Sequence, residues 1–207
     1  EVFARGPRLL SGMDAEVVAT LQANMQARGV RLHLEAPVSA LHATGGGVRV
    51  VHKGQEQGVV AEVFDRVLFA TGRRPNTAGL GLEEAGVELG GHGEVVVDQW
   101  QDTSLEGVHA VGDVTGRLAL TPVAIAAARR LMARLFGGQA DAKLDYADVP
   151  TVVFSHPPLA TVGLTEEQAR ERYGDAVRVH ASNFRPMLTA LADSPQRSLF
   201  KLVCVGE

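Results

Sequence analysis

The clearest pattern of hydrophobic and polar positions lies in the first 34 residues. Apolar side chains recur at helical spacing within residues 14–28, with Val17, Val18, Leu21 and Met25 on one face. Gly29 follows as a stop signal, because glycine commonly ends helices. Strand-like residues 1–5 and 30–34 flank this helix, so the pattern predicts one βαβ unit of a parallel sheet.

Residues 38–69 carry a strand pattern of a different kind. Apolar stretches at 38–43 and 48–52 flank three glycines and predict a hairpin, which residues 59–64 extend to a small antiparallel meander. Residues 66–69 are apolar enough to predict a return to a buried strand. The small residues that follow, up to Gly72 and Arg73, allow either a ligand contact or a tight turn between domains.

The stretch from Val108 to Leu135 has the pattern of a strand, a turn and a helix. Residues 108–111 predict a short strand that ends at Gly112 and Asp113. Thr121 is interpreted as an N-cap before a helix over residues 123–135. A carboxylate at a strand end and a helix N-terminus together suit a cofactor with hydroxyl and anionic groups. An ordinary turn with a capped helix would give the same pattern.

The remaining chain predicts a second module after a polar connector at residues 139–150. Its elements alternate between strands and one helix, as expected for a further α/β domain. After the connector, strands are predicted over residues 151–154, 161–163, 176–182 and 198–205, and a helix over residues 165–173. Before the connector, a further strand is predicted over residues 94–97.

Composition narrows the functional classes. The chain is 45% hydrophobic and 21% charged with a net charge of −4, which is typical of a globular protein and gives no support for nucleic-acid binding. No apolar run is long enough to predict a membrane span. A single cysteine, Cys204, fits a reducing compartment, so a cytoplasmic location is expected. The seven histidines show no metal-ligand spacing, and no metal site is predicted.

One short motif and one basic residue could indicate nucleotide binding. Gly79-Leu80-Gly81 fails as a dinucleotide loop, because Glu84 stands at the third glycine position and no strand precedes it. Arg5, at the carboxyl end of the first strand, lies where a nucleotide would bind and could meet a phosphate. A solvated surface arginine is the alternative.

Several of these stretches resemble a known family, the flavin-dependent pyridine nucleotide–disulfide oxidoreductases, and within it the bacterial glutathione reductases. The resemblance rests on residues 70–75 (ATGRRP), 110–113 (AVGD), 120–127 (LTPVAIAA), 150–158 (PTVVFSHPP), 161–166 (TVGLTE) and 201–206 (KLVCVG). It implies an α/β fold, namely part of a Rossmann-like FAD- and NAD(P)-binding enzyme followed by the start of an α+β dimer-interface domain. The implied domains are residues 1–69, 70–149 and 150–207.

The resemblance also implies cofactors, partners and roles for particular residues. FAD would be bound by Asp113 at its ribityl chain and by the backbone around Leu120 and Thr121 at the flavin ring. The implied sites are, for FAD, Gly112, Asp113, Leu120, Thr121, Gly72 and Arg73; for the 2′-phosphate of NADPH, Arg5; and for glutathione disulfide, Arg129, Ile125 and Met187, the last in the partner subunit of a homodimer.

This chain also departs from the family pattern. The redox cysteine pair, both glycine loops and the His-Glu pair used for proton transfer are expected to lie outside these 207 residues, so the segment alone is expected neither to reduce disulfides nor to hold FAD tightly. Ser11 stands where a second NADPH arginine is expected, with Arg8 nearby. Leu188 replaces a usual tyrosine and Ala128 a usual glycine. Lipoamide, mercuric or other disulfide reductases of the family, and a non-catalytic module that retains the fold, remain open as alternatives.

Overall fold

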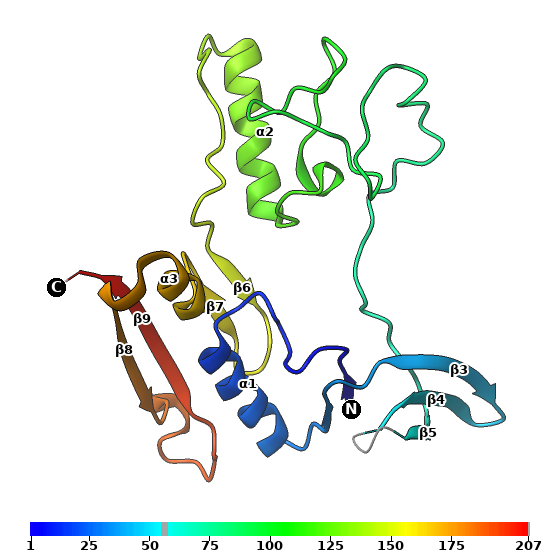
Figure 1. The fold of residues 1–207 in the computed structure, drawn as a ribbon, viewed down its shortest axis with the longest axis vertical. Coiled ribbons are helices and arrows are strands. Elements are labelled where there is room, and N and C mark those ends of the chain that lie inside the picture. The colour runs from blue at the N-terminus through cyan, green and yellow to red at the C-terminus, as the bar shows by residue number, and fades with distance from the viewer. Residues whose placement is uncertain (55–57, 207) are drawn as a thin grey trace. The chain divides into compact units, whose positions relative to one another are not determined.

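The structure, a computed structural model, describes residues 1–54 and 58–206. These residues form two compact units. The first combines residues 1–68 with 147–206, and the second comprises residues 69–146 (Figure 1). The division into three domains at residues 1–69, 70–149 and 150–207 stays a prediction, because the compactness of these two units does not test it.

The βαβ unit predicted at the start of the chain is present. Strand β1 (Val2–Phe3) pairs in parallel with β2 (Leu32–His33), and α1 (Ala15–Ala27) connects them. The carboxylate of Asp14 caps α1 by accepting hydrogen bonds from the backbone N–H groups of Glu16 and Val17. The helix ends before Gly29, whose φ of 87° is a conformation that glycine adopts without strain.

The predicted meander is confirmed, whereas the strand predicted after it is wrong. Strands β3 (Val38–Thr44), β4 (Gly47–Lys53) and β5 (Val59–Phe64) form an antiparallel sheet in that order. Residues 66–69 form no strand, and the Leu68 side chain is 90% exposed. Their apolar sequence would suit the middle of a sheet, but no described strand pairs with them, so their backbone lacks the partner that a strand needs.

The C-terminal part of the first unit contains the predicted helix and strands, which pair as two hairpins; the strand predicted over residues 161–163 lies two residues earlier, at Leu159–Thr161. Thr165 caps α3 in a capping box: its hydroxyl accepts from the Gln168 backbone, and the Gln168 side chain accepts from the Thr165 backbone. The elements are β6 (Thr151–Val153), β7 (Leu159–Thr161), α3 (Glu166–Tyr173), the 3-10 turn η2 (Gly174–Ala176), β8 (Val177–Phe184), the 3-10 turn η3 (Met187–Thr189) and β9 (Ser198–Val205), with β6–β7 and β8–β9 antiparallel.

The core of the first unit forms where α1 packs against the C-terminal hairpins. Val18 and Leu21 of α1 are buried against Leu159 of β7. Figure 1 shows α1 beside β7 and β9, elements that are more than 120 residues away in the sequence. The buried side chain of Asn24 joins the same elements, because its amide both accepts from the Arg197 N–H and donates to the Arg197 carbonyl, at 3.0 Å each.

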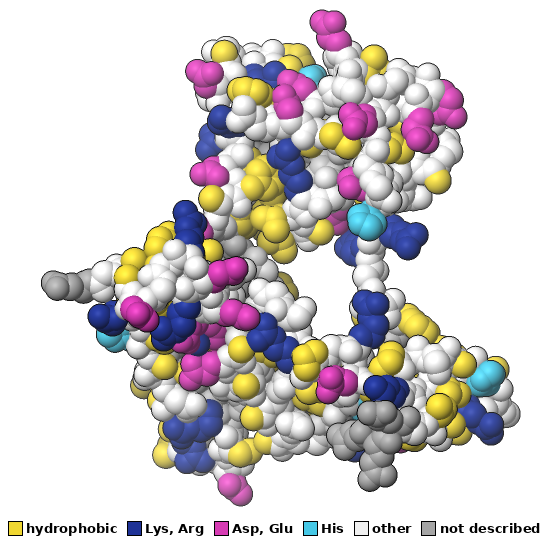
Figure 2. Space-filling model, viewed as in Figure 1, with side chains coloured by type: hydrophobic (Ala, Val, Ile, Leu, Met, Phe, Trp, Pro, Cys, Tyr) yellow, Lys and Arg dark blue, Asp and Glu magenta, His cyan; other side chains and the backbone are white. Residues whose placement is uncertain are grey.

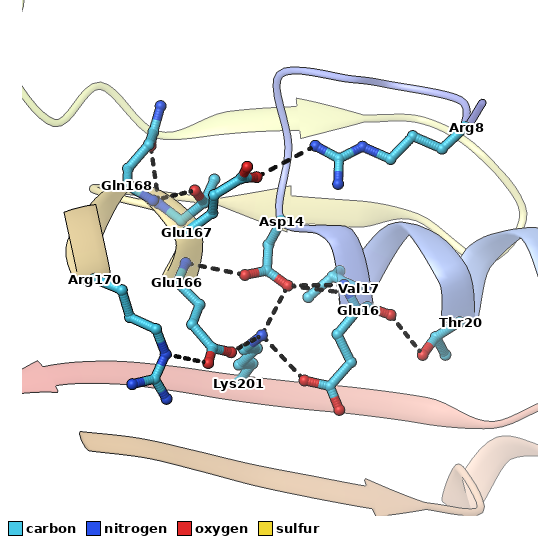
Figure 3. A network of polar contacts seen from close by, with 11 residues as sticks. Arg8, Asp14, Glu16, Val17, Thr20, Glu166, Glu167, Gln168, Arg170 and Lys201 are labelled. Carbon is cyan, nitrogen blue, oxygen red and sulfur yellow. Dashed lines mark hydrogen bonds and ion pairs between the residues drawn. The ribbon is translucent and has the colours of Figure 1, made fainter. Parts of the chain in front are cut away.

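A buried ammonium group links α1, α3 and β9. Lys201, with 5% of its side chain exposed, lies 3.0 Å from Asp14, 3.0 Å from Glu16 and 2.7 Å from Glu166 (Figure 3). Asp14 also accepts from the Glu166 backbone N–H at 3.1 Å, so its carboxylate caps both α1 and α3. One lysine and one aspartate therefore tie three elements together.

The contacts within this cluster lower the pKa values of Asp14 and Glu166 and raise the pKa of Lys201. Burial by itself lowers the pKa of Lys201, but its hydrogen bonds to Glu166, Asp14 and Glu16 outweigh burial and raise that pKa. Burial by itself raises the pKa of Asp14, and the Glu166 N–H and Lys201 together lower it below its ordinary value. Hydrogen bonds from Lys201 and then Arg170 lower the pKa of Glu166.

The lowered pKa values predict an acid-sensitive stability of the first unit. An acid whose pKa is lowered by folding stabilises the folded state fully at pH values above its pKa in the unfolded chain, about 3.9 for Asp and 4.3 for Glu. This stabilisation is lost as the pH falls through the lower pKa of the folded state. We expect the free energy of unfolding to fall below about pH 5. Asp14→Asn keeps a good N-cap residue but removes the titrating group, so it should flatten this acid slope.

Urea unfolding between pH 7 and pH 3, followed by circular dichroism, measures the slope. Asp193→Asn is the matched control, because Asp193 is an exposed carboxylate elsewhere in the same unit. An unchanged slope in Asp14→Asn would show that the Lys201 cluster does not govern the acid response.

The second unit is built around one helix, α2 (Thr121–Phe136), which follows the 3-10 turn η1 (Gly112–Thr115). Val123, Ala127 and Leu131 form its buried face. The strands predicted at residues 94–97 and 108–111 are wrong. Each is reduced to one bridge, Leu89–Val95 and Asp102–His109, because turns and single hydrogen bonds continue the chain on either side.

An aspartate in a loop fastens α2 to the rest of the second unit. Asp102 accepts from the His109 ring at 2.6 Å and pairs with Arg134 of α2. Arg134 also donates to the Trp100 carbonyl at 3.3 Å. These contacts hold the C-terminal half of α2 and so fix the direction in which its N-terminus points.

Helix length and surface charge bear on whether a membrane or a nucleic acid could be a partner. Within the described residues no helix is long and apolar enough to cross a membrane; α2, with 16 residues, is shorter than the roughly 20 that a span requires. Figure 2 shows basic and acidic side chains interspersed over the visible face of the described residues, which is not the continuous basic surface that a phosphate backbone favours.

Candidate functional site

The candidate cofactor site starts at the turn before α2. Gly112 has a φ of 80°, and a Cβ placed on it would lie 3.3 Å from the Cβ of Ala124. A side chain here would therefore be strained by the backbone and crowded by the helix. Glycine at this position therefore allows η1 to pack closely against the first turn of α2. This packing is a second reason for the glycine, beside the ligand approach expected from the sequence.

The N-terminus of α2 is open to solvent, but its cap differs from the prediction. Leu120, not Thr121, is the N-cap residue, and no side chain accepts a hydrogen bond from the first turn. Thr121 and Pro122 are the first two helical residues, because the Leu120 carbonyl already accepts from the Ala124 N–H at 3.0 Å. Uncapped N–H groups at a helix start favour an anion or an electron-rich ligand.

The structure brings together two site residues that lie 40 positions apart in the sequence. A guanidinium nitrogen of Arg73 lies 3.2 Å from a carboxylate oxygen of Asp113. Gly72, with a φ of 127°, allows the turn that presents Arg73. Both charged side chains are substantially exposed, at 82% and 44%, so this ion pair is open to a ligand.

The exposed face of α2 carries the predicted substrate residues. Thr121, Ile125 and Arg129 follow one another at four-residue steps and are all exposed, Ile125 by 46%. Arg130 is also exposed, and ideal helix geometry directs it about 100° away from Arg129. This face therefore runs from the open helix start to a cation about two turns along.

The other two predicted site residues belong to the first unit. Arg5 is exposed and lies two residues after the end of β1, near the carboxyl end of the strand as expected. Arg8, the substitute considered for a second phosphate-binding arginine, donates to the Ser11 carbonyl at 2.9 Å and lies 3.9 Å from Glu167. Met187 begins η3 and is 92% exposed, as a residue at a subunit interface would be in an isolated chain.

Sequence spacing missed one cluster altogether. His33, His52 and Glu62, from three separate strands of the first unit, place ligand atoms within 4.8 Å of one another. The prediction of no metal site rested on dispersed histidines, and dispersal in sequence does not prevent strands from bringing them together. No sequence signal marks the cluster, because its members share no spacing.

Two family models match the chain. A model described as "Pyridine nucleotide-disulphide oxidoreductase" matches residues 1–128, and one described as the dimerisation domain of the same group matches residues 149–207. The first model covers Arg5, Gly72, Arg73, the turn at Gly112 and Asp113, and the start of α2. The second covers Met187 and the hairpin β8–β9.

Individual relatives are similar over nearly the whole chain. A glutathione reductase of chloroplasts and mitochondria from Pisum sativum is 42% identical over 208 residues, which cover 100% of this chain and 36% of that protein. Two solved structures, both Cu(II) complexes of the HOCl-induced flavoprotein disulfide reductase RclA from Escherichia coli, one of them a mutant, have TM-scores of 0.85 and 0.82. They are 31% and 28% identical, and the matches cover 97% and 98% of this chain. The chain spans less than half the length of each of these proteins, 36%, 44% and 45% respectively.

Proposed function

This chain belongs to the pyridine nucleotide-disulphide oxidoreductase family, and from this premise we propose that it is part of a homodimeric, NADPH-dependent glutathione-disulfide reductase. The observation that carries the proposal is the open N-terminus of α2 beside the Asp113–Arg73 pair. The exposed face of α2 then leads from this corner to Arg129.

The residues at this corner fit FAD. Asp113 offers an exposed carboxylate that can accept hydrogen bonds from ribityl hydroxyl groups, and Gly112 keeps the backbone free of a side chain there. The uncapped N–H groups at Thr121 and Val123 suit an electron-rich ring edge, since a helix N-terminus stabilises negative charge. When bound, the flavin would accept a hydride from the nicotinamide and pass its electrons to a disulfide.

Arg5 supports NADPH as the reductant. It stands at the carboxyl end of a parallel strand, where nucleotides bind in open α/β sheets, and no acidic residue occupies positions 3 or 4 to favour ribose hydroxyls. A guanidinium can meet a 2′-phosphate with charge-assisted hydrogen bonds. Arg8 is engaged with Ser11 and Glu167, so we expect the preference for NADPH to rest mainly on Arg5.

Replacing Arg5 by alanine should therefore weaken NADPH selectively. Because Arg5 is exposed, its contribution is expected near the top of the range for surface charges, about 1 kcal/mol, or roughly a fivefold rise in KM for NADPH. KM for NADH should not change. Steady-state assays of the whole enzyme with both nucleotides check this, with Arg28→Ala, an exposed arginine after α1, as the control. Equal effects on the two nucleotides would remove Arg5 from the phosphate site.

Glutathione disulfide is proposed as the substrate on two grounds. Arg129 presents a positive charge two turns from the helix start, and glutathione carries carboxylates that such a charge can bind. The relative from Pisum sativum, 42% identical over the whole chain, is a glutathione reductase. Met187, in the part that matches the dimerisation domain, is proposed to line the same site from the partner subunit.

The test is an activity assay of the whole protein. Purified enzyme should show the absorption of bound flavin and oxidise NADPH when glutathione disulfide is added. Lipoamide and mercuric ion are tested in parallel, because the main alternative is another disulfide reductase of the family. The similarity to RclA and the presence of Leu188 and Ala128 support this alternative. Preference for either competitor would replace glutathione as the substrate. Absence of flavin and of any NADPH oxidation would favour a non-catalytic module.

A further inference from the structure

Two imidazoles and a carboxylate meet in the first unit, in residues that the flavin chemistry does not use. His33 lies on β2, His52 on β4 and Glu62 on β5, and one ligand atom of each lies within 4.8 Å of the other two. His52 is buried, with 3% of its side chain exposed, whereas 24% of His33 and 33% of Glu62 are exposed. The cluster thus has one fixed member and two that can adjust.

Strand register places the cluster on one face of the meander. His52 pairs with Val60, and Glu62 pairs with Val50, so His52 and Glu62 are diagonal neighbours on the same face of β4 and β5. Phe3 of β1 stacks on His33 with ring centroids 4.4 Å apart and contacts the His52 ring at 4.7 Å. This aromatic packing brings the two imidazoles next to each other without using their nitrogen atoms.

The hydrogen bonds of His52 leave a basic nitrogen facing a carboxylate. Nδ1 of His52 lies 3.0 Å from the Lys53 carbonyl, which can only accept, so Nδ1 carries the hydrogen. In the neutral ring Nε2 then holds a lone pair, and it lies 3.3 Å from Oε1 of Glu62. Two acceptors at this distance require a positive charge between them, either a proton on Nε2 or a metal ion.

His33 shows the arrangement that metal-binding histidines commonly have. Its Nε2 lies 2.8 Å from a carboxylate oxygen of Glu1, which can accept the N–H and so leave Nδ1 as the basic nitrogen. Carboxylates and carbonyls that hold the second ring nitrogen, as Glu1 and the Lys53 carbonyl do, orient imidazoles toward a metal.

We propose that His33, His52 and Glu62 form a binding site for a divalent cation of the zinc class, with a fourth position left for water. Two imidazoles and one carboxylate are a donor set that Zn²⁺ accepts with tetrahedral geometry. Ligand atoms around such an ion are about 3.4 Å apart, so ligand atoms now up to 4.8 Å apart must approach by as much as about 1.4 Å, which rotation of the partly exposed Glu62 and His33 can supply. A cavity of about 560 Å³ lined by all three residues gives the ion access.

The site is tested on the whole protein with its thiols alkylated and metals removed by chelation. Titration with ZnCl₂ by calorimetry should show one site per chain, and Co²⁺ should give the visible absorption of a tetrahedral complex. Glu62→Gln and His33→Gln each remove a ligand at a partly exposed position, and we expect each to weaken Zn²⁺ binding at least about tenfold. His42→Gln, which changes an exposed histidine on β3 of the same sheet, should bind as the wild type does.

The alternative is that His52 and Glu62 form only an ion pair. Wild-type protein that binds no Zn²⁺, or Glu62→Gln and His33→Gln variants that bind it unchanged, would establish the ion pair and overturn the metal site. Because both changes lie at partly exposed positions, matching circular dichroism spectra confirm that the variants are folded. This outcome would leave the proposed flavin chemistry untouched, since none of the three residues belongs to that site.

Discussion

Replacing Lys201 by methionine is expected to lower the free energy of unfolding by about 3 kcal/mol, the low end of the cost of removing one partner from a buried ion pair. Lys201 is 5% exposed, and its ammonium pairs with the carboxylates of Asp14, Glu16 and Glu166. Without the ammonium, three carboxylates of like charge remain between α1, α3 and β9. The cost stays at the low end because Glu16 and Glu166 are partly exposed and Asp14 keeps its backbone hydrogen bonds.

Urea unfolding at pH 7, followed by circular dichroism, measures this loss. Lys53→Met is the matched control, because Lys53 is an exposed lysine on β4, and it should change stability by less than about 0.5 kcal/mol. The difference between wild type and Lys201→Met should shrink below about pH 4, where the carboxylates become protonated and the ammonium loses its partners. A variant as stable as the wild type at pH 7 would show that α1 and β9 are held together by apolar packing alone.

Replacing Arg129 by alanine is expected to raise KM for glutathione disulfide and to lower kcat/KM by about tenfold to a hundredfold. A hydrogen bond to a charged group contributes roughly 1.5–3 kcal/mol, and its loss should appear in substrate binding. This prediction depends on the proposed function, because it assigns Arg129 to a carboxylate of the substrate. KM for NADPH should remain unchanged, since Arg5, and not Arg129, is the residue proposed to bind the nucleotide.

Arg130→Ala is the control for this experiment. It removes an equally exposed arginine from the same turn of α2, but from a different side of the helix. If both variants lose the same amount of activity, the effect is one of general charge and Arg129 has no specific role. If neither changes KM for the disulfide, Arg129 is a solvated cation near the end of the helix, where the dipole favours it.

Elements with local signals could be predicted from the sequence. Helix α1 follows from its apolar spacing between Asp14 and Gly29, and α3 from the polar turn that Thr165 opens. The meander β3–β4–β5 follows from apolar stretches separated by glycines. In each case the residues that start and stop the element lie within a few positions of it, so local sequence is enough to predict where the element lies.

Strands without a partner could not be predicted in this way. Residues 66–69 and 108–111 have apolar sequences, but a strand exists only when a second segment offers its backbone groups. The cap of α2 is a similar case. Thr121 has the right side chain for a cap, yet Leu120 takes that position because its carbonyl, not the hydroxyl of Thr121, begins the helical hydrogen bonds.

The sequence by itself determined the family, the helices with their stop signals, and the candidate residues Asp113, Thr121 and Arg129. Only the tertiary structure decided which side chains meet: Arg73 with Asp113, and the buried Lys201 with the caps of α1 and α3. It also gathered the metal ligands proposed above from three strands. The reason is physical: periodicity and capping act within one or two turns of chain, whereas charge pairing and metal coordination depend on distances that only packing sets.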